Sequence, residues 1–251
     1  MDISRNQEVF LEEIESAQVS LWMKREDELH PYISGNKFRK LKYNLEEAVA
    51  KGFRTLLTFG GAYSNHISAL AYAGNSKGLK TIGIIRGEEL TVRPDLVAEN
   101  PTLSFAGKLG MELEFVSREV YKSRHEKEFV ALLKERFGAF YLVPEGGTNA
   151  LAVKGCEEIL VADDEIFDYI CVPVGTGGTM AGLINSARDS QKVLGFPSLK
   201  GDFLHKEISK RAVHDHNWSL VNDYHFGGYA KINEKLISFI NQFYRSTTIP
   251  L

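Results

Sequence analysis

Short apolar runs alternate with amphipathic stretches along most of this chain. The apolar runs are rich in β-branched and aromatic residues and most are bounded by Gly or Pro, which is typical of buried strands. They cover residues 55–59, 80–86, 111–116, 139–143, 168–174 and 191–196. Because strand-like and helix-like segments alternate, the sequence predicts an α/β fold of parallel sheets covered by helices.

Helix signals lie between these runs. Residues 66–78 and 126–138 are helical candidates, and the second ends on Gly138. A third helix is predicted to start at Asn100-Pro101, with Asn as the N-cap and Pro at the first helical position. In open parallel sheets, ligands bind in the loops that follow the strands. Functional residues are therefore expected in those loops.

Composition places the chain among ordinary globular proteins. Its 251 residues are 43% hydrophobic, and 30 Lys and Arg against 33 Asp and Glu give a net charge of −3. Such a balance does not favour a nucleic-acid partner. The acidic first 18 residues contain no long apolar run, so neither a signal peptide nor a membrane anchor is expected, and the cytoplasm is the expected location.

Cysteine and histidine patterns do not predict a metal site. Cys156 and Cys171 are the only cysteines, and their spacing fits neither a metal knuckle nor a CxxC redox pair. We expect both to be buried, reduced side chains. The cluster His214-Asp215-His216 lies in a polar stretch and is interpreted as a solvated surface segment rather than a set of ligands.

The loop at residues 174–182, VGTGGTMAG, follows one apolar run and leads into a predicted helix. Its glycines allow close backbone approach to a ligand, and its threonines add hydroxyl groups at a helix N-terminus. The residues are Gly175, Thr176, Gly177, Gly178 and Thr179. The alternative is a tight strand–helix turn capped by Thr179. A dinucleotide fingerprint fits badly because Met180 occupies its third glycine position. The pattern favours a cradle for a single phosphate ester.

A second loop, FGGAYSNH at residues 59–66, follows the run at 55–59. Two glycines permit an abrupt turn, after which Ser64, Asn65 and His66 present a hydroxyl, an amide and an imidazole at a helix start. The alternative is that Ser64 or Asn65 only caps the helix, which leaves His66 an ordinary first-turn residue.

A basic run, SGNKFRKLKY at residues 34–43, contains Lys37, Arg39, Lys40 and Lys42 and no acid. Lys37 is placed at a helix start and close to other cations. Both features disfavour its charged form, lower its pKa and make its amine available as a nucleophile. The alternative is a solvated helix face, which is the commoner environment of lysine.

These three loops occur in an order and spacing that resemble the fold-type II pyridoxal-phosphate (PLP) enzymes of the 1-aminocyclopropane-1-carboxylate (ACC) deaminase and D-cysteine desulfhydrase family. The resemblance runs from about Leu21 to the end, through PEGGTNALAVKG at 144–155 and FGGYAK at 226–231. It implies a homodimer and two lobes, with residues 37–144 inserted into a larger PLP-binding lobe of residues 1–36 and 145–251. PLP is then expected in the cleft between the lobes.

The resemblance assigns roles at the cofactor. Lys37 binds PLP covalently and then moves protons at the substrate carbon, while Lys40 reaches the cofactor phosphate. Residues 175–179 complete the phosphate cup, and Asn65 hydrogen-bonds the 3′-oxygen of the pyridine ring. With these assignments, Arg39 and Lys42 are expected to be solvated.

The substrate implied by the resemblance is a small amino acid. Ser64 is expected to bind the substrate carboxylate or act on its carbon, Asn65 and His66 to line the substrate site, and Tyr229 to lie near the substrate. In this family, His after the Ser-Asn pair is typical of the desulfhydrase branch and Gln-Thr of ACC deaminases. His66-Ile67 therefore favours conversion of D-cysteine to pyruvate, ammonia and sulfide, with deamination of ACC to 2-oxobutanoate as the alternative.

Two further points follow from the resemblance. The family continues beyond residue 251 with an Asp-Pro-x-Tyr-Thr-Gly-Lys-like motif and the group that faces the pyridine nitrogen, so the C-terminal part is expected to be missing here. A non-catalytic binding protein that kept the fold is a rival interpretation. It would have lost the reactive lysine or the Ser-Asn pair, whereas Lys37, Ser64 and Asn65 are all present.

Overall fold

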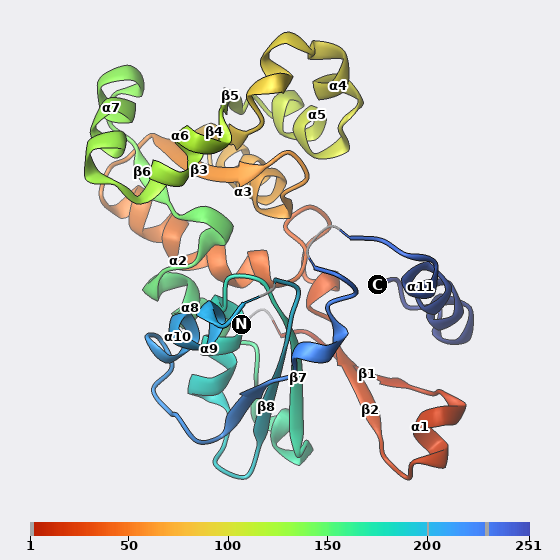
Figure 1. Cartoon of the computed structure of the whole chain (residues 1–251). Helices are drawn as coiled ribbons and strands as arrows, with labels where there is room; N and C mark the ends of the chain where they lie inside the picture. The colour runs from red at the N-terminus through yellow and green to blue at the C-terminus, as the bar shows by residue number, and fades with distance from the viewer. Residues whose placement is uncertain (1–2, 200, 229–230) are drawn as a thin grey trace. The chain divides into compact units, whose positions relative to one another are not determined.

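The computed structural model describes residues 3–199, 201–228 and 231–251. Contacts within the chain divide it into two compact units. The middle unit is residues 30–156, and the terminal unit combines residues 1–29 with 157–251. Figure 1 shows the elements of both units, coloured along the chain.

The middle unit is built on a four-stranded parallel sheet with the order β5-β4-β3-β6. The strands are β3 (Thr55–Gly61), β4 (Lys80–Arg86), β5 (Glu112–Val116) and β6 (Tyr141–Val143). Their carboxyl ends lie at one edge of the sheet, because all four run in the same direction. The loop with Ser64 and Asn65 follows β3 at that edge.

Helices cover both faces of this sheet, and adjacent strand residues alternate between two cores. Leu56 packs with Leu41, Leu70 and Leu103 from the helices of one face. Its neighbour Leu57 packs with residues of the opposite face. The helices of the first core are α2 (Asn36–Ala50), α3 (Asn65–Ser76) and α5 (Pro101–Lys108), and those of the second are α6 (Arg118–Lys122) and α7 (Lys127–Phe137). The unit also contains α4 (Pro94–Glu99) and α8 (Ala150–Cys156).

The terminal unit has a parallel sheet with the order β7-β8-β9 and a separate antiparallel hairpin β1-β2. Phe243 of the last helix, α11, packs with Val9 of the hairpin. The strands are β1 (Asn6–Val9), β2 (Leu21–Lys24), β7 (Tyr169–Val174), β8 (Lys192–Pro197) and β9 (Trp218–Leu220). The helices are α1 (Glu12–Ser16), α9 (Gly178–Ser186), α10 (Phe203–Ser209) and α11 (Glu234–Thr247).

Short 3₁₀ helices connect several of these elements. They are Glu26–Glu28, Glu88–Val92, Ser123–His125, Glu145–Gly147, Ala162–Ile166 and Asn222–Tyr224. No helix among the described residues is both long enough and apolar enough to span a bilayer.

The predicted α/β fold of parallel sheets covered by helices is confirmed, and each of the six predicted strands is present. The predicted Asn100 cap is also present, since its side-chain oxygen accepts a hydrogen bond of 2.9 Å from Leu103 N. Gly138 ends α7 in a left-handed conformation with φ of +75°. The β1-β2 hairpin and β9 were not predicted, because these strands are only three or four residues long and give a weak pattern.

The chain passes from one compact unit to the other between residues 29 and 30 and between residues 156 and 157. The boundaries expected from the sequence lie at 36–37 and 144–145. The reason is that α8 packs closely against α2 within the middle unit. A Cβ on Gly155 would lie only 2.0 Å from the backbone oxygen of Arg39, so glycine is required at this contact. The division into a cofactor-binding lobe and an inserted lobe stays a prediction.

Two expectations about burial are wrong. Cys171 is exposed, because β7 is an edge strand whose alternate residues face away from the helices of its unit. Arg39 is only 2% exposed rather than solvated. Lys42 is half-buried, and its ammonium lies 5.0 Å from the centre of the Tyr43 ring. The basic run is therefore not a solvated helix face.

Candidate functional site

Lys37 lies in the first turn of α2, which Gly35 introduces with a left-handed φ of +59°. Its side chain is half-buried, and its Nζ donates to Asn36 Oδ1 at 3.1 Å. Burial lowers the pKa of the Lys37 amine, while the nearby Cys156 thiol acts in the opposite direction. The predicted direction is correct, but its main cause is loss of solvation rather than neighbouring cations. A lowered pKa leaves more of the amine unprotonated and nucleophilic.

Lys40 lies one helical turn later and is 2% exposed. Its ammonium donates to the Gly146 carbonyl at 3.1 Å and to Thr148 Oγ1 at 2.9 Å. Both acceptors belong to the loop that follows β6. Two neutral oxygens hold the ammonium in place, and neither of them neutralises its charge.

Ser64 and Asn65 follow β3 at the carboxyl edge of the sheet. Ser64 is the N-cap of α3 with extended backbone angles, but its side chain makes no capping hydrogen bond. The sharp turn depends on Gly60, where a Cβ would lie 2.5 Å from Ile67 Cγ1 and 3.1 Å from Ser64 Cβ. The capping alternative is therefore not what the structure shows for Ser64. The Ser64 hydroxyl and the exposed Asn65 side chain lie at a helix N-terminus, a suitable place for a carboxylate.

The imidazole of His66 is 1% exposed and points into the middle unit. Its Nε2 lies 2.9 Å from Thr58 Oγ1 on β3. Burial lowers the pKa of His66 well below the usual value, and the charges of Lys37 and Lys40 lower it further. The ring is thus a neutral group inside the fold, and its predicted contact with the substrate stays a prediction.

A buried polar network, which sequence patterns did not reveal, supports α2 behind the two lysines. Asn44 is fully buried, and its amide donates to the Lys40 carbonyl at 2.8 Å. Asn149 Nδ2 donates to Asn44 Oδ1 at 2.7 Å, and the Tyr141 hydroxyl donates to Glu47 Oε2 at 2.6 Å. Asn44 lies four residues after Lys40 and seven after Lys37 on α2. This polar residue within an apolar stripe was the one available signal in the sequence.

The glycine-rich loop of the terminal unit connects β7 to α9. Gly177 is the N-cap of α9, in the left-handed conformation with φ of +81°. A Cβ at this position would lie 2.8 Å from Ile208 Cγ1 of α10. Thr179 is buried inside the first turn rather than serving as the cap. Glycine is therefore required at position 177, and the role of residues 175–179 as a phosphate cradle stays a prediction.

Met180, which interrupts the dinucleotide fingerprint, has a packing role. It is 1% exposed, and a Cβ on Gly195 of β8 would lie 2.3 Å from its sulfur. The methionine side chain therefore fills the space that Gly195 leaves between α9 and the sheet. A close helix–strand approach is achieved here by a glycine on the strand instead of one on the helix.

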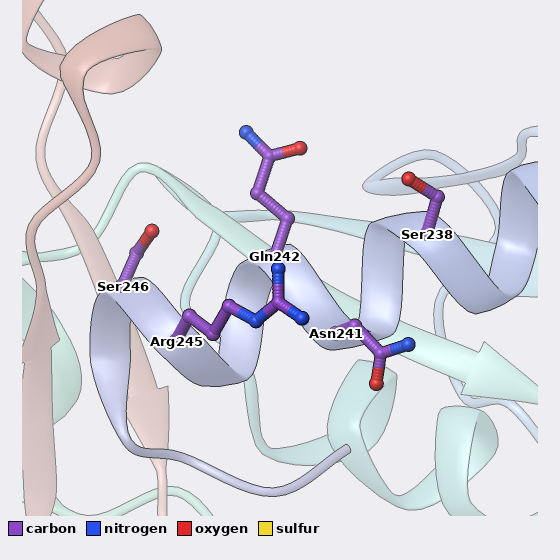
Figure 2. A pocket seen from close by; sticks show the side chains of 5 residues that line it. All are labelled: Ser238, Asn241, Gln242, Arg245 and Ser246. Atoms are coloured by element: carbon purple, nitrogen blue, oxygen red, sulfur yellow. The ribbon is translucent and has the colours of Figure 1, made fainter.

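Other parts of the described chain contribute less to a site. A hollow of about 510 Å³ lies on the polar side of α11, and none of the predicted site residues line it. Figure 2 shows the side chains that do. Its lining residues are Ser238, Asn241, Gln242, Arg245 and Ser246. The described residues contain no group of three or more His, Cys, Asp and Glu side chains placed to hold a metal ion. Tyr229 lies outside the described residues.

The residues present fit the two ends of PLP, the cofactor implied by the resemblance. In the middle unit, a half-buried lysine amine of lowered pKa suits an aldehyde, and the buried Lys40 ammonium suits an anion. In the terminal unit, the backbone around Gly177 suits a phosphate ester. The chemistry of these groups therefore fits PLP, and the way in which they would hold it stays a prediction.

Known proteins similar to this chain include enzymes named for ACC deaminase and D-cysteine desulfhydrase activity. The chain is 37% identical over 171 residues to a putative ACC deaminase of Thermotoga maritima, covering 65% of this chain and 53% of that protein. It is 36% identical over 182 residues to the mitochondrial bifunctional D-cysteine desulfhydrase/ACC deaminase of Arabidopsis thaliana, covering 65% of this chain and 44% of that protein. The chain thus spans about half the length of the curated relatives that it matches.

The crystal structure of an ACC deaminase homologue superimposes with a TM-score of 0.83 at 25% sequence identity. The match covers 99% of this chain and 79% of that one, and it confirms the predicted fold-type II architecture. The model of the family described as pyridoxal-phosphate dependent enzyme matches residues 7–225. With a match over most of its length, this chain belongs to the pyridoxal-phosphate dependent enzyme family.

Proposed function

We propose that this protein deaminates a small amino acid with PLP, in the manner of a D-cysteine desulfhydrase. D-Cysteine and water would give pyruvate, ammonia and hydrogen sulfide. The observation that carries the proposal is the half-buried Lys37 amine, whose pKa burial lowers at the start of α2. Relatives named as D-cysteine desulfhydrase and ACC deaminase support the same chemistry.

PLP, when bound, supplies an electron-withdrawing ring that makes the α-hydrogen of an amino acid acidic. The chain's own residues would do the rest. The Lys37 amine is the base that takes the α-proton, and its lowered pKa favours the unprotonated form that this step needs. As the proton leaves Cα, the Cβ–S bond breaks, and sulfide departs with the bonding electrons. Hydrolysis of the remaining unsaturated amine gives pyruvate and ammonia.

The start of α3 would orient the substrate. Ser64 and Asn65 lie at its N-terminus, where unpaired backbone N–H groups and the helix dipole favour a carboxylate. Asn65 is also the proposed partner of the 3′-oxygen of the cofactor ring. Lys40 and residues 175–179 are the proposed phosphate ligands. Tyr229 keeps its proposed place near the substrate from the resemblance alone.

The alternative substrate is ACC, which has no α-hydrogen, so its ring must open by loss of a methylene proton. The Arabidopsis relative, named for both activities, is the reason to keep this alternative. The two are separated by measuring sulfide from D-cysteine and 2-oxobutanoate from ACC, with the PLP-loaded protein and with Lys37→Ala. We expect sulfide to dominate, and the variant to form neither product.

A larger rate with ACC would select the alternative. If the PLP-loaded protein formed neither product while Lys37 still bound PLP, the non-catalytic interpretation would be supported instead. Two further expectations rest on the resemblance: a homodimer, which light scattering after gel filtration tests, and a cytoplasmic location, which fractionation of the source cells tests.

A further inference from the structure

His66 differs from the other candidate residues because its ring is buried beneath them. It starts from the first turn of α3 and points to β3, where Nε2 lies 2.9 Å from Thr58 Oγ1. The Thr58 hydroxyl donates to the Val143 carbonyl of β6 at 2.8 Å. Since that hydroxyl has one proton, its oxygen accepts from His66, which assigns the proton of the neutral ring to Nε2.

Nδ1 of His66 is buried and has no hydrogen-bond partner among the described residues. A buried nitrogen without a partner costs free energy, so its position calls for an explanation. The ring is kept neutral mainly by burial, then by the positive charges of Lys37 and Lys40 on α2, although the Pro144 carbonyl favours the protonated form. A proton on Nδ1 as well as Nε2 would make the ring positive beside two positive lysines, so Nδ1 is expected to be unprotonated.

The unpaired side of the ring faces the loop that follows β6. Gly147 has a left-handed φ of +71°, and a Cβ there would lie 3.1 Å from His66 Cε1 and 3.4 Å from Nδ1. The two neighbours of Gly147 provide the acceptors for the Lys40 ammonium, at 3.1 Å on Gly146 O and 2.9 Å on Thr148 Oγ1. The imidazole thus supports the same loop that holds Lys40.

We propose that His66 is a positioning residue: its neutral ring, fixed by Thr58, supports residues 146–148 and so holds the Lys40 ammonium where a phosphate is bound. This inference rests on the proposed function, in which Lys40 contacts the cofactor phosphate. It gives His66 a role through Lys40 instead of a direct contact with the substrate. His66 therefore affects affinity for the phosphate end of the cofactor and not its aldehyde end.

A double-mutant cycle tests this coupling, with PLP and with pyridoxal, which lacks the phosphate, as probes. His66→Leu removes both ring nitrogens and retains an apolar side chain. We expect it to raise the dissociation constant for PLP by about threefold to tenfold, a part of one charge-assisted contact, and to leave that for pyridoxal nearly unchanged. In the Lys40→Ala background, the same change should alter PLP affinity by less than about twofold.

Equal weakening of PLP and pyridoxal, or an undiminished effect in the Lys40→Ala background, would show that His66 has only a structural role. Thr58→Val serves as a second variant if His66→Leu does not fold. It removes the hydroxyl at nearly constant shape, and we expect the same selective loss of PLP affinity. An unchanged PLP affinity in Thr58→Val would contradict the proposal.

A third readout needs no cofactor. In ¹⁵N spectra of the PLP-free protein, His66 should be neutral with its proton on Nε2 at pH 6.5, the usual midpoint of a histidine. A half-protonated ring, or a proton on Nδ1, would overturn the assignment. If the wild-type protein bound no PLP, the proposed function would fail together with the phosphate role, while this spectrum would still decide the state of His66.

Discussion

The two units carry candidate functional groups of different kinds. In the middle unit the functional groups are side chains, Lys37 and Lys40, whose surroundings are a buried polar network and a neutral histidine. In the terminal unit the candidate group is the backbone, shaped by Gly177 at the start of α9. The candidate groups of the middle unit therefore depend on how several helices and strands pack around them. The candidate group of the terminal unit depends on the local conformation of the chain.

The largest effect is expected from Lys37→Ala. Loss of the proposed base and covalent anchor should reduce turnover by at least about 10²–10⁴-fold, the usual contribution of acid–base catalysis. Turnover of D-cysteine and the absorbance of lysine-bound PLP measure it. Lys51→Ala on the exposed end of the same helix is the matched control and should retain both. Substantial turnover by Lys37→Ala would show that Lys37 is neither the base nor the covalent anchor.

Lys40→Ala should weaken PLP binding by about 1.5–3 kcal/mol, the value of one hydrogen bond to a charged group. A PLP titration followed by absorbance measures the change. Pyridoxal affinity should change little, because the lysine is proposed to contact the phosphate. A loss of the same size for pyridoxal would place Lys40 at the other end of the cofactor.

A pair of glycine variants tests the backbone character of the terminal unit. Gly177→Ala should lower the free energy of unfolding by about 1–3 kcal/mol, because alanine is strained at φ of +81° and its Cβ would lie 2.8 Å from Ile208. Gly175→Ala is the matched control. No atom lies within 4 Å of its Cβ position, so a change within about 0.5 kcal/mol is expected. Urea denaturation compares the two, and equal losses would contradict the account.

The smallest effect is a pH dependence from His66. Its pKa is lowered in the folded chain, so below about pH 6.5 the unfolded chain binds a proton that the folded chain does not. The free energy of unfolding of the PLP-free protein should therefore fall as the pH decreases from 7.5 to 5.5, by at most about 1.4 kcal/mol per pH unit for one proton. His66→Gln should reduce this slope. A slope unchanged by His66→Gln would show that the ring is charged in the folded state.

Six strands and the loops after them could be predicted from the sequence, because strand runs and glycine spacing are local signals. The cap at Asn100 could be predicted in this way, whereas the left-handed N-cap at Gly177 was not. The environment of side chains could not. The burial of Arg39 depends on the packing around α2, and the exposure of Cys171 depends on the position of β7 at the edge of a sheet.

The same limit applies within the site. The sequence indicated a lowered pKa for Lys37, but it attributed the shift to neighbouring cations, whereas burial is the larger cause. Asn44, Asn149 and Thr58 were missed, since a single buried polar residue in an apolar stripe has no motif. Such residues become visible only when the helices and strands that they connect are placed in contact.

The most direct test of the central claim is to identify the lysine that binds the cofactor. The protein is incubated with PLP, reduced with borohydride and digested, and the peptides carrying the phosphopyridoxyl group are sequenced by mass spectrometry. We expect the label on Lys37, within the peptide that begins α2, and no label on Lys37→Ala. A label on Lys40, Lys42 or any lysine other than Lys37 would contradict it.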